Sequence, residues 1–144
     1  MKAFKFSLQA VLDNAINQKN DCIVKLKDVL GKIKCSEDEK DRLLVDILSN
    51  ESKLQEYSNI SNFKQIKVYI EELLLEIEKN KREIDRLNTL RLQRLEELKQ
   101  AKIKCSAFEK IKEKKYIQYL DIIKKFEEKE IEEFINYNYF VKAE

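Results

Sequence analysis

The sequence predicts an all-α protein: a long antiparallel two-helix coiled-coil hairpin whose second helix extends beyond the first. Proline is absent from the 144 residues and glycine occurs once, so the strongest helix breakers are almost missing. Charged residues make up 39% of the chain, against about 25% in a typical globular domain. Apolar residues recur at alternating steps of four and three, which is the spacing of a coiled-coil seam.

The first helix is predicted over about residues 7–57. Ser7 is placed to cap its N-terminus, with Phe6 and Val11 forming a hydrophobic staple across the cap. Its seam positions are Leu8, Leu12, Ala15, Lys19, Cys22, Leu26, Val29, Ile33, Ser36, Lys40, Leu43, Ile47, Asn50, Leu54 and Tyr57.

The middle of this helix leaves two alternatives open. Polar seam positions cluster next to Gly31, and Ser36 with Glu39 has the S-x-x-E pattern of a capping box. The helix either continues through this stretch or kinks and restarts between Gly31 and Ser36.

The turn is predicted at about residues 58–62. The stretch "YSNISNF" holds two Asn and two Ser, whose side chains compete with the helix backbone and favour turns and caps. Asn62 and Gln65 resemble a second capping box, so the second helix is expected over about 63–136, followed by an aromatic tail over about 137–144. All 144 residues would form a single coiled-coil domain.

The second seam starts at Phe63 and widens around Leu90, Leu92, Leu95 and Leu98, which we interpret as a stutter. Its other positions are Ile66, Ile70, Leu73, Ile77, Asn80, Ile84, Leu87, Ala101, Cys105, Phe108, Ile111, Tyr119, Ile122, Phe126 and Phe134. With a turn near residue 60, the numbers of facing residues sum to roughly 120, as expected for an αα-hairpin. The expected neighbours are Leu54 and Ile66, Leu26 and Arg94, and Leu8 and Lys112. Residues 113–140 would then extend beyond the first helix, and Cys35 would lie too far from Cys105 for a disulfide.

Nothing in the sequence indicates catalysis, a metal site or a cofactor site. Histidine is absent, and a single glycine cannot build a phosphate-binding loop. The carboxylates lie at the i,i+4 spacing of a solvated helix face, as in Glu78 with Arg82 and Lys79 with Glu83. The 29 basic and 27 acidic residues are mixed along the chain, whereas nucleic-acid binders gather basic residues on one face. We therefore expect neither an enzyme nor a nucleic-acid-binding protein.

The apolar runs are too short to span a bilayer, and no signal-peptide pattern occurs at the N-terminus. The three cysteines show no CxxC spacing. These features predict a reduced cytoplasmic chain that does not insert into a membrane directly.

Both ends of the predicted hairpin carry aromatic residues. Tyr137, Tyr139 and Phe140 lie beyond any helix partner, and either fold back over Phe4 and Phe6 or form an exposed partner patch. At the other end, Tyr57 fits the seam, whereas Tyr69 is explained equally well by seam packing or by a partner contact.

Three blocks of the sequence resemble the flagellar FliJ family, the small coiled-coil stalk proteins of the bacterial flagellar type III export apparatus. They are "FKFSLQAVLD" (4–13), "AFEKIKEKKYIQYL" (107–120) and "FEEKEIEEFI" (126–135). In the third, Glu127, Lys129, Ile131, Glu132 and Glu133 match the pattern E-x-K-x-L-[DE]-E. Family members often carry Arg and Glu just after the first block, where this chain has Ala15 and Lys19, so a contact made by those charges would be missing here.

The resemblance implies a non-enzymatic stalk that links the hexameric flagellar export ATPase to the membrane-embedded export gate and assists export chaperones. Such a protein is cytoplasmic and peripheral to the cell membrane through the export apparatus. The resemblance assigns to the ATPase-facing region Leu8, Val11, Leu12, Glu113, Lys114, Lys115, Glu132 and Glu133. It assigns to the gate-facing region Tyr57, Tyr69, Ile70 and Leu73.

The sequence leaves other readings open. A coiled-coil scaffold that dimerises through the same seam has the same periodicity. A coiled-coil chaperone could hold unfolded clients with its aromatic tail. The stalk of a needle-complex type III secretion system would also share these features.

Overall fold

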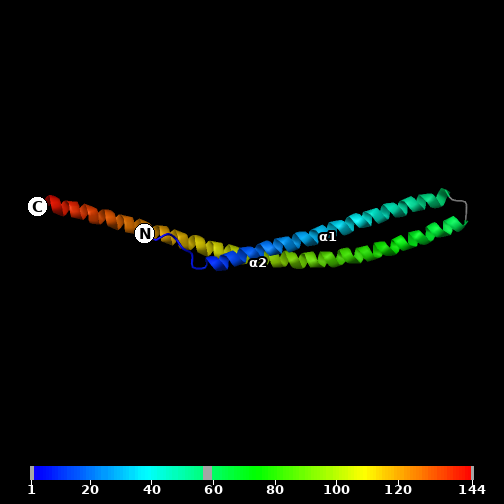
Figure 1. Cartoon of the computed structure of the whole chain (residues 1–144), viewed down its shortest axis with the longest axis horizontal. Coiled ribbons are helices and arrows are strands. Elements are labelled where there is room, and N and C mark those ends of the chain that lie inside the picture. The colour runs from blue at the N-terminus through cyan, green and yellow to red at the C-terminus, as the bar shows by residue number, and fades with distance from the viewer. Residues whose placement is uncertain (1, 57–59, 144) are drawn as a thin grey trace. The chain divides into compact units, whose positions relative to one another are not determined.

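The computed structural model describes residues 2–56 and 60–143, which form two α-helices and, in these ranges, no strand (Figure 1). α1 spans Gln9–Glu56 and α2 spans Ile60–Ala143. Their contacts divide the chain into two compact units, and both helices contribute to each. Unit 1 comprises Met1–Lys19 and Gln100–Glu144, and unit 2 comprises Asn20–Lys99. The prediction of an all-α helical hairpin is confirmed.

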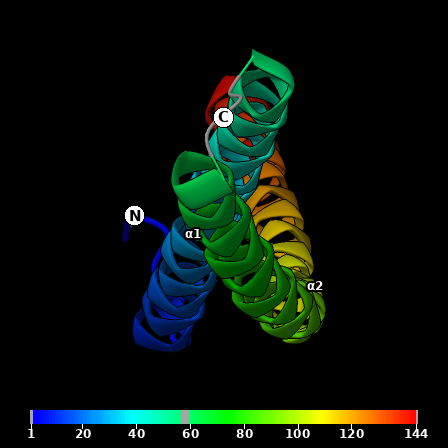
Figure 2. The ribbon, with the colours of Figure 1, turned by 90° about the vertical axis from the view of Figure 1, so that its right-hand side faces the viewer.

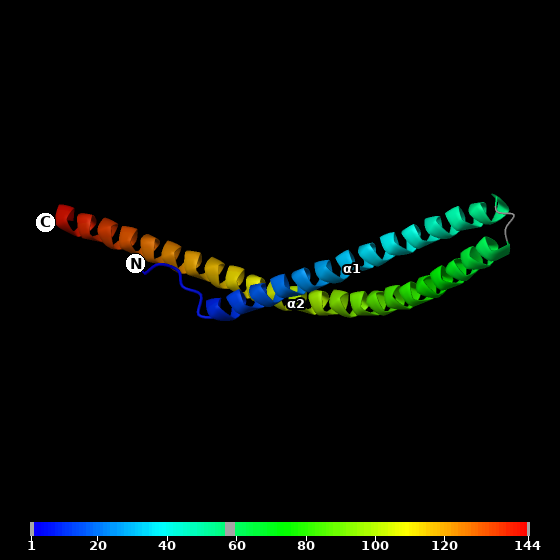
Figure 3. The ribbon, with the colours of Figure 1, turned by 45° about the vertical axis from the view of Figure 1, so that its right-hand side comes forward.

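In unit 2 the two helices run side by side in opposite directions (Figures 1 and 3). Figure 2 views this pair from the end where α1 stops and α2 begins. One buried cluster joins Leu43 and Ile47 of α1 to Ile70, Leu73 and Ile77 of α2. The predicted neighbours Leu54 and Ile66 both pack against this cluster. A second cluster joins Val29 and Ile33 to Leu87, with Leu90 beside it. These residues occupy the predicted seam positions, apart from Leu90, which lies where the seam was expected to widen.

The predicted stutter near Leu90 is wrong. The spacing of four and three continues from Leu87 through Arg91 and Arg94 to Leu98, with both arginines half-buried, whereas Leu92 and Leu95 are exposed. Arginine can occupy a seam because its methylene stem packs against apolar neighbours while the guanidinium reaches outward. The seam therefore keeps one register through a stretch where leucine spacing alone suggests a shift.

α1 continues without a break through Gly31 and Ser36. One glycine costs a helix interior only about 1 kcal/mol relative to alanine, and the packing of Val29 and Ile33 on either side outweighs this cost. The Ser36–Glu39 capping box is not used, because the Glu39 carboxylate accepts hydrogen bonds from Arg42 at 2.9 and 2.5 Å instead. Of the two alternatives, the continuous helix is the one observed.

The helix ends differ from the predicted positions. α1 begins at Gln9, whose N–H donates to the carbonyl of Phe6 at 3.1 Å, so Ser7 belongs to a turn that precedes the helix. α2 already includes Asn62, and the second capping box is therefore not used. Asn62 is exposed to solvent, where its side chain need not compete with the backbone. The expected aromatic tail is helical through Ala143, because this stretch contains neither glycine nor proline.

In unit 1, the first turns of α1 and the non-helical segment before them pack against α2. Phe6, Leu12, Ala15 and Cys105 form the buried cluster, with Phe4, Ile16 and Phe108 at its edge. Phe6 thus packs into this core, whereas Val11, its expected staple partner, is exposed. Cys105 is a free thiol, as are Cys22 and Cys35.

Candidate partner-binding surfaces

The C-terminal segment of α2, residues 120–143, leaves many large apolar side chains in solvent. Their exposure decides between the two predicted alternatives for the aromatic end, because Tyr139, for example, is 77% exposed and does not fold back over Phe4. The exposed members are Leu120, Ile122, Phe126, Ile131, Phe134, Ile135, Tyr137, Tyr139, Phe140 and Val141. Large exposed apolar patches mark interaction sites on soluble proteins. This segment is the strongest partner-binding candidate in unit 1.

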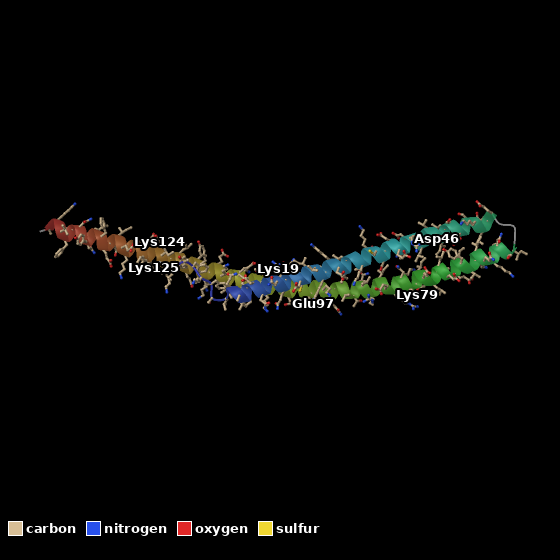
Figure 4. The ribbon with its side chains drawn as sticks, viewed as in Figure 1. Lys19, Asp46, Lys79, Glu97, Lys124 and Lys125 are labelled. Atoms are coloured by element: carbon tan, nitrogen blue, oxygen red, sulfur yellow. The ribbon has the colours of Figure 1, made fainter. Side chains whose placement is uncertain are left out.

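Charged residues are placed regularly along α2 from about residue 113 onward. Lys114 and Glu132 are 18 residues apart, as are Lys115 and Glu133. This separation is about five helical turns, so each pair lies on one face of the helix, about 27 Å apart along the axis. Lys124 and Lys125 project from the same stretch (Figure 4), and Lys125 contacts Asp121 at 3.2 Å in full solvent. Charges of both signs are therefore exposed on the same stretch of α2 as the apolar side chains.

The predicted ATPase-facing residues are mostly accessible. Leu8 and Val11 are partly exposed beside the start of α1, whereas Leu12 is only 3% exposed and belongs to the core of unit 1. The charged members of the set, Glu113, Lys114, Lys115, Glu132 and Glu133, are all exposed. A partner can thus reach every member except Leu12 without separating the helices.

The predicted gate-facing residues divide in the same way. Ile70 is 8% exposed and Leu73 is 4% exposed, so both hold α1 and α2 together. Tyr69 remains accessible beside a shallow surface groove of about 330 Å³ that also borders Lys64 and Glu72. Tyr57 lies outside the described residues.

The Tyr69 side chain links the two helices of unit 2. Its hydroxyl donates a hydrogen bond to Oδ2 of Asp46 on α1 at 2.9 Å. Asn50, buried in the seam, donates from Nδ2 to the backbone carbonyl of Asp46 at 2.7 Å and to its Oδ1 at 3.2 Å. The hydrogen bond to Asp46, followed by the negative charge of that carboxylate, raises the pKa of the Tyr69 phenol. We call these three hydrogen bonds the polar clasp. They account for a tyrosine at position 69, where the spacing of the apolar seam does not require one.

An aromatic cluster in unit 1 joins the first and second sequence blocks. The ring of Phe4 lies 5.2 Å from that of Tyr116 and 5.4 Å from that of Tyr119, measured between centroids. The Tyr119 hydroxyl donates to the backbone carbonyl of Lys2 at 2.9 Å. These contacts tie the non-helical N-terminal residues to α2.

Sequence spacing found only part of these contacts. Tyr119 was assigned to the seam, but Tyr116 and Asp46 were missed because both lie beside the seam positions. The signal for Asp46 was weak: its spacing to Asn50 places both residues on one face of α1. Which residue of α2 Asp46 contacts depends on the register between the two helices, and spacing within α1 does not give that register.

The described part of the chain contains no group of three or more His, Cys, Asp or Glu side chains that could hold a metal ion. Within it, neither helix contains a stretch apolar enough to cross a membrane. The shifted pKa values have two kinds of cause, pairing with a nearby side chain and burial. Arg42 lowers the pKa of Glu39, for example, and burial raises that of the Cys105 thiol.

Comparison with protein families identifies one match along almost the whole chain. The model of the flagellar FliJ protein family matches residues 4–144. This chain belongs to the FliJ family. The resemblance predicted from the three sequence blocks is thereby confirmed. Comparison with curated proteins and with solved structures gave no match.

FliJ membership assigns the chain to flagellar protein export, and the family is a structural, non-catalytic component that acts in the cytoplasm. Two of the three FliJ-like blocks meet in unit 1, where Phe4 of the first contacts Tyr116 and Tyr119 of the second. The third block, residues 126–135, lies entirely in the exposed C-terminal segment of α2.

Proposed function

We propose that this FliJ protein is a non-enzymatic stalk of the flagellar export ATPase complex, linking the ATPase hexamer to the export gate and assisting export chaperones. The observation that carries the proposal is the exposed apolar surface of residues 120–143 in a chain of this family. A helix that served only to stabilise its own fold would not keep ten large apolar side chains in solvent.

The ATPase contact is assigned to unit 1. It uses Leu8 and Val11 at the start of α1 together with the exposed charges of α2 from Glu113 to Glu133. Exposed ion pairs are each worth under about 1 kcal/mol, so many of them can hold a stalk in a ring of subunits without locking it. Leu12 contributes indirectly, because it fixes α1 against α2.

The export-gate contact is assigned to the part of unit 2 around Tyr69. Ile70 and Leu73 support this surface from inside the helix pair. Association with the cell membrane is then peripheral and depends on the gate protein.

The test is stimulation of ATP hydrolysis by the purified flagellar export ATPase. The variant Lys114→Glu/Lys115→Glu should need up to about thirtyfold more protein for half-maximal stimulation, since two exposed contacts are inverted. Lys25→Glu/Lys27→Glu makes the same charge change in unit 2 and should behave as the native chain. Equal stimulation by both variants would reject the assigned ATPase surface.

A further inference from the structure

The N-terminal residues that precede α1 contact the rest of unit 1 mainly through side chains. Phe6 is buried among Leu12, Ala15 and Cys105, while Phe4 packs at the edge of the same cluster. Lys5, between them, is exposed. Alternation of buried and exposed side chains is the pattern of an extended peptide lying on a surface. We call residues 2–8 the strap.

α2 supplies a defined aromatic site for the strap. The Phe4 ring meets that of Tyr116 edge-on, at an interplanar angle of 70°, and meets that of Tyr119 at 47°. The two tyrosine rings are themselves stacked, with centroids 6.3 Å apart. At the end of the strap, the Tyr119 hydroxyl binds the carbonyl of Lys2. One aromatic pocket and one hydrogen bond to a main-chain carbonyl are the elements with which proteins recognise short peptides.

The site is larger than the strap that occupies it. A groove of about 520 Å³ continues from Phe4 along the junction of α1 and α2. Its apolar wall is formed by Leu12, Ile16 and Tyr116. Its polar lining is Gln9, Glu109, Lys112 and Glu113, with charges of both signs. A ligand with a longer or bulkier side chain than Phe4 would find unfilled apolar surface there.

We propose that the strap is detachable and that the surface beneath it binds an extended peptide carrying two aromatic residues two positions apart. The strap occupies this surface in cis, and a partner peptide of the same chemistry would displace it. The proposal does not depend on the assigned ATPase or gate contacts, because it rests only on the geometry of unit 1.

The tether sets the affinity that a competing peptide needs. A short flexible linker gives an effective concentration on the order of millimolar. A strap that is docked in roughly nine of ten molecules then requires a dissociation constant of about 0.1 mM for the same peptide added in trans. This affinity lies within the range that NMR titration measures.

The experiment titrates a free peptide of residues 2–8 into a chain that lacks residues 2–6. The chain carries fluorotyrosine, and the signals of Tyr116 and Tyr119 are assigned with single Tyr→Phe variants. We expect saturable shifts of these two signals in the truncated chain and shifts at least about fivefold smaller in the full chain, whose site is already occupied. Linear or absent shifts in the truncated chain, or equal shifts in both chains, would overturn the proposal.

Variant peptides provide the matched controls. A peptide with Phe4→Ala and Phe6→Ala should not shift either signal, whereas Lys5→Ala should bind as the native peptide does. If both variants bind equally, the aromatic spacing is not what the surface recognises and the proposal fails.

A second measurement uses the full chain, in case the truncated one does not fold. Trypsin should cleave after Lys5 several times faster in Phe4→Ala than in the native chain, because the strap detaches more often. Ile103→Ala, at an exposed site on α2 in the same unit, should leave the cleavage rate unchanged. Equal rates for Phe4→Ala and the native chain would contradict a strap held by this aromatic contact.

Discussion

The Tyr69 hydroxyl on α2 donates a hydrogen bond to Asp46 on α1 at 2.9 Å, a contact between residues 23 positions apart in the chain. The apolar seam itself is compatible with neighbouring registers, since leucine and isoleucine pack against many partners. A hydrogen bond has a fixed geometry, so it forms in one register and not in its neighbours. Together with the bonds from Asn50 to Asp46, it specifies which turn of α1 faces which turn of α2.

This clasp predicts a pH-dependent contribution to stability. Because the pKa of Tyr69 is raised in the folded chain, the folded state holds the phenolic proton more tightly than the unfolded state does. The contribution should be complete below the usual tyrosine pKa of about 10 and lost as the pH rises through the raised value. Thermal unfolding of the native chain and Tyr69→Phe should therefore differ at neutral pH and converge at high pH. A difference in Tm that does not change with pH would contradict the clasp.

The interhelix core should be sensitive to truncation. Leu43 is 2% exposed and packs between the helices, so Leu43→Ala should lower the free energy of unfolding by about 2–5 kcal/mol. Leu75, 64% exposed on α2, provides the control. Leu75→Ala should change the free energy of unfolding by no more than about 0.5 kcal/mol. Urea unfolding followed by circular dichroism measures both. Similar losses at the two sites would mean that the seam is misassigned.

The continuity of α1 predicts that two substitutions stabilise the chain or leave it unchanged. No atom lies within 4 Å of the position that a Cβ would take at Gly31, so Gly31→Ala should add about 0.5–1 kcal/mol. Ser36→Ala should be neutral or slightly stabilising, because alanine is the better helix former. If Ser36 capped a second helix, its loss would instead cost about 1 kcal/mol. Denaturant unfolding of the two variants distinguishes a continuous helix from a restarted one.

The three thiols should react in the order of their exposure. Cys35 is exposed, Cys22 is half-buried and Cys105 is buried. Burial, and then the contact with Glu109 at 3.5 Å, raises the pKa of Cys105, and only the thiolate reacts. In single-cysteine variants, Cys105 should react with a disulfide reagent on the order of tenfold more slowly than Cys35. Fast labelling of Cys105 in folded protein would show that unit 1 opens readily.

The helices and their pairing were predictable because they depend on local quantities. Helix breakers are nearly absent, and seam residues such as Leu43 and Ile77 follow a strict spacing. Helix ends were less predictable, since Asn62 and Ser36 carry the chemistry of caps yet lie within helices. Whether such a residue caps or continues a helix depends on packing several turns away. The predicted stutter fails because Arg91 and Arg94 fill seam positions that leucine spacing alone does not indicate.

The candidate surfaces were predictable only as regions. The sequence locates the aromatic residues at 137–140. It does not determine whether they fold back over the N-terminal residues or remain exposed, as the structure shows they do. The contacts of Phe4 with Tyr116 and of Asp46 with Tyr69 bring together residues far apart in the chain. Their positions depend on the interhelix register to within one turn, which spacing alone does not determine.

The central claim is that α1 and α2 of one chain pair in opposite directions, which leaves the C-terminal segment of α2 free for a partner. Electron-spin distance measurement in unit 2 tests it most directly, with labels replacing Lys25 and Leu95 in a cysteine-free chain diluted with unlabelled protein. Because packed helix axes lie about 8–10 Å apart, we expect the labels at positions 25 and 95 to be about 10–25 Å apart. A control pair of labels at Lys25 and Val68 should be about 40 Å apart. A Lys25–Leu95 distance beyond about 60 Å, as for helices that do not pair within one chain, would contradict the account.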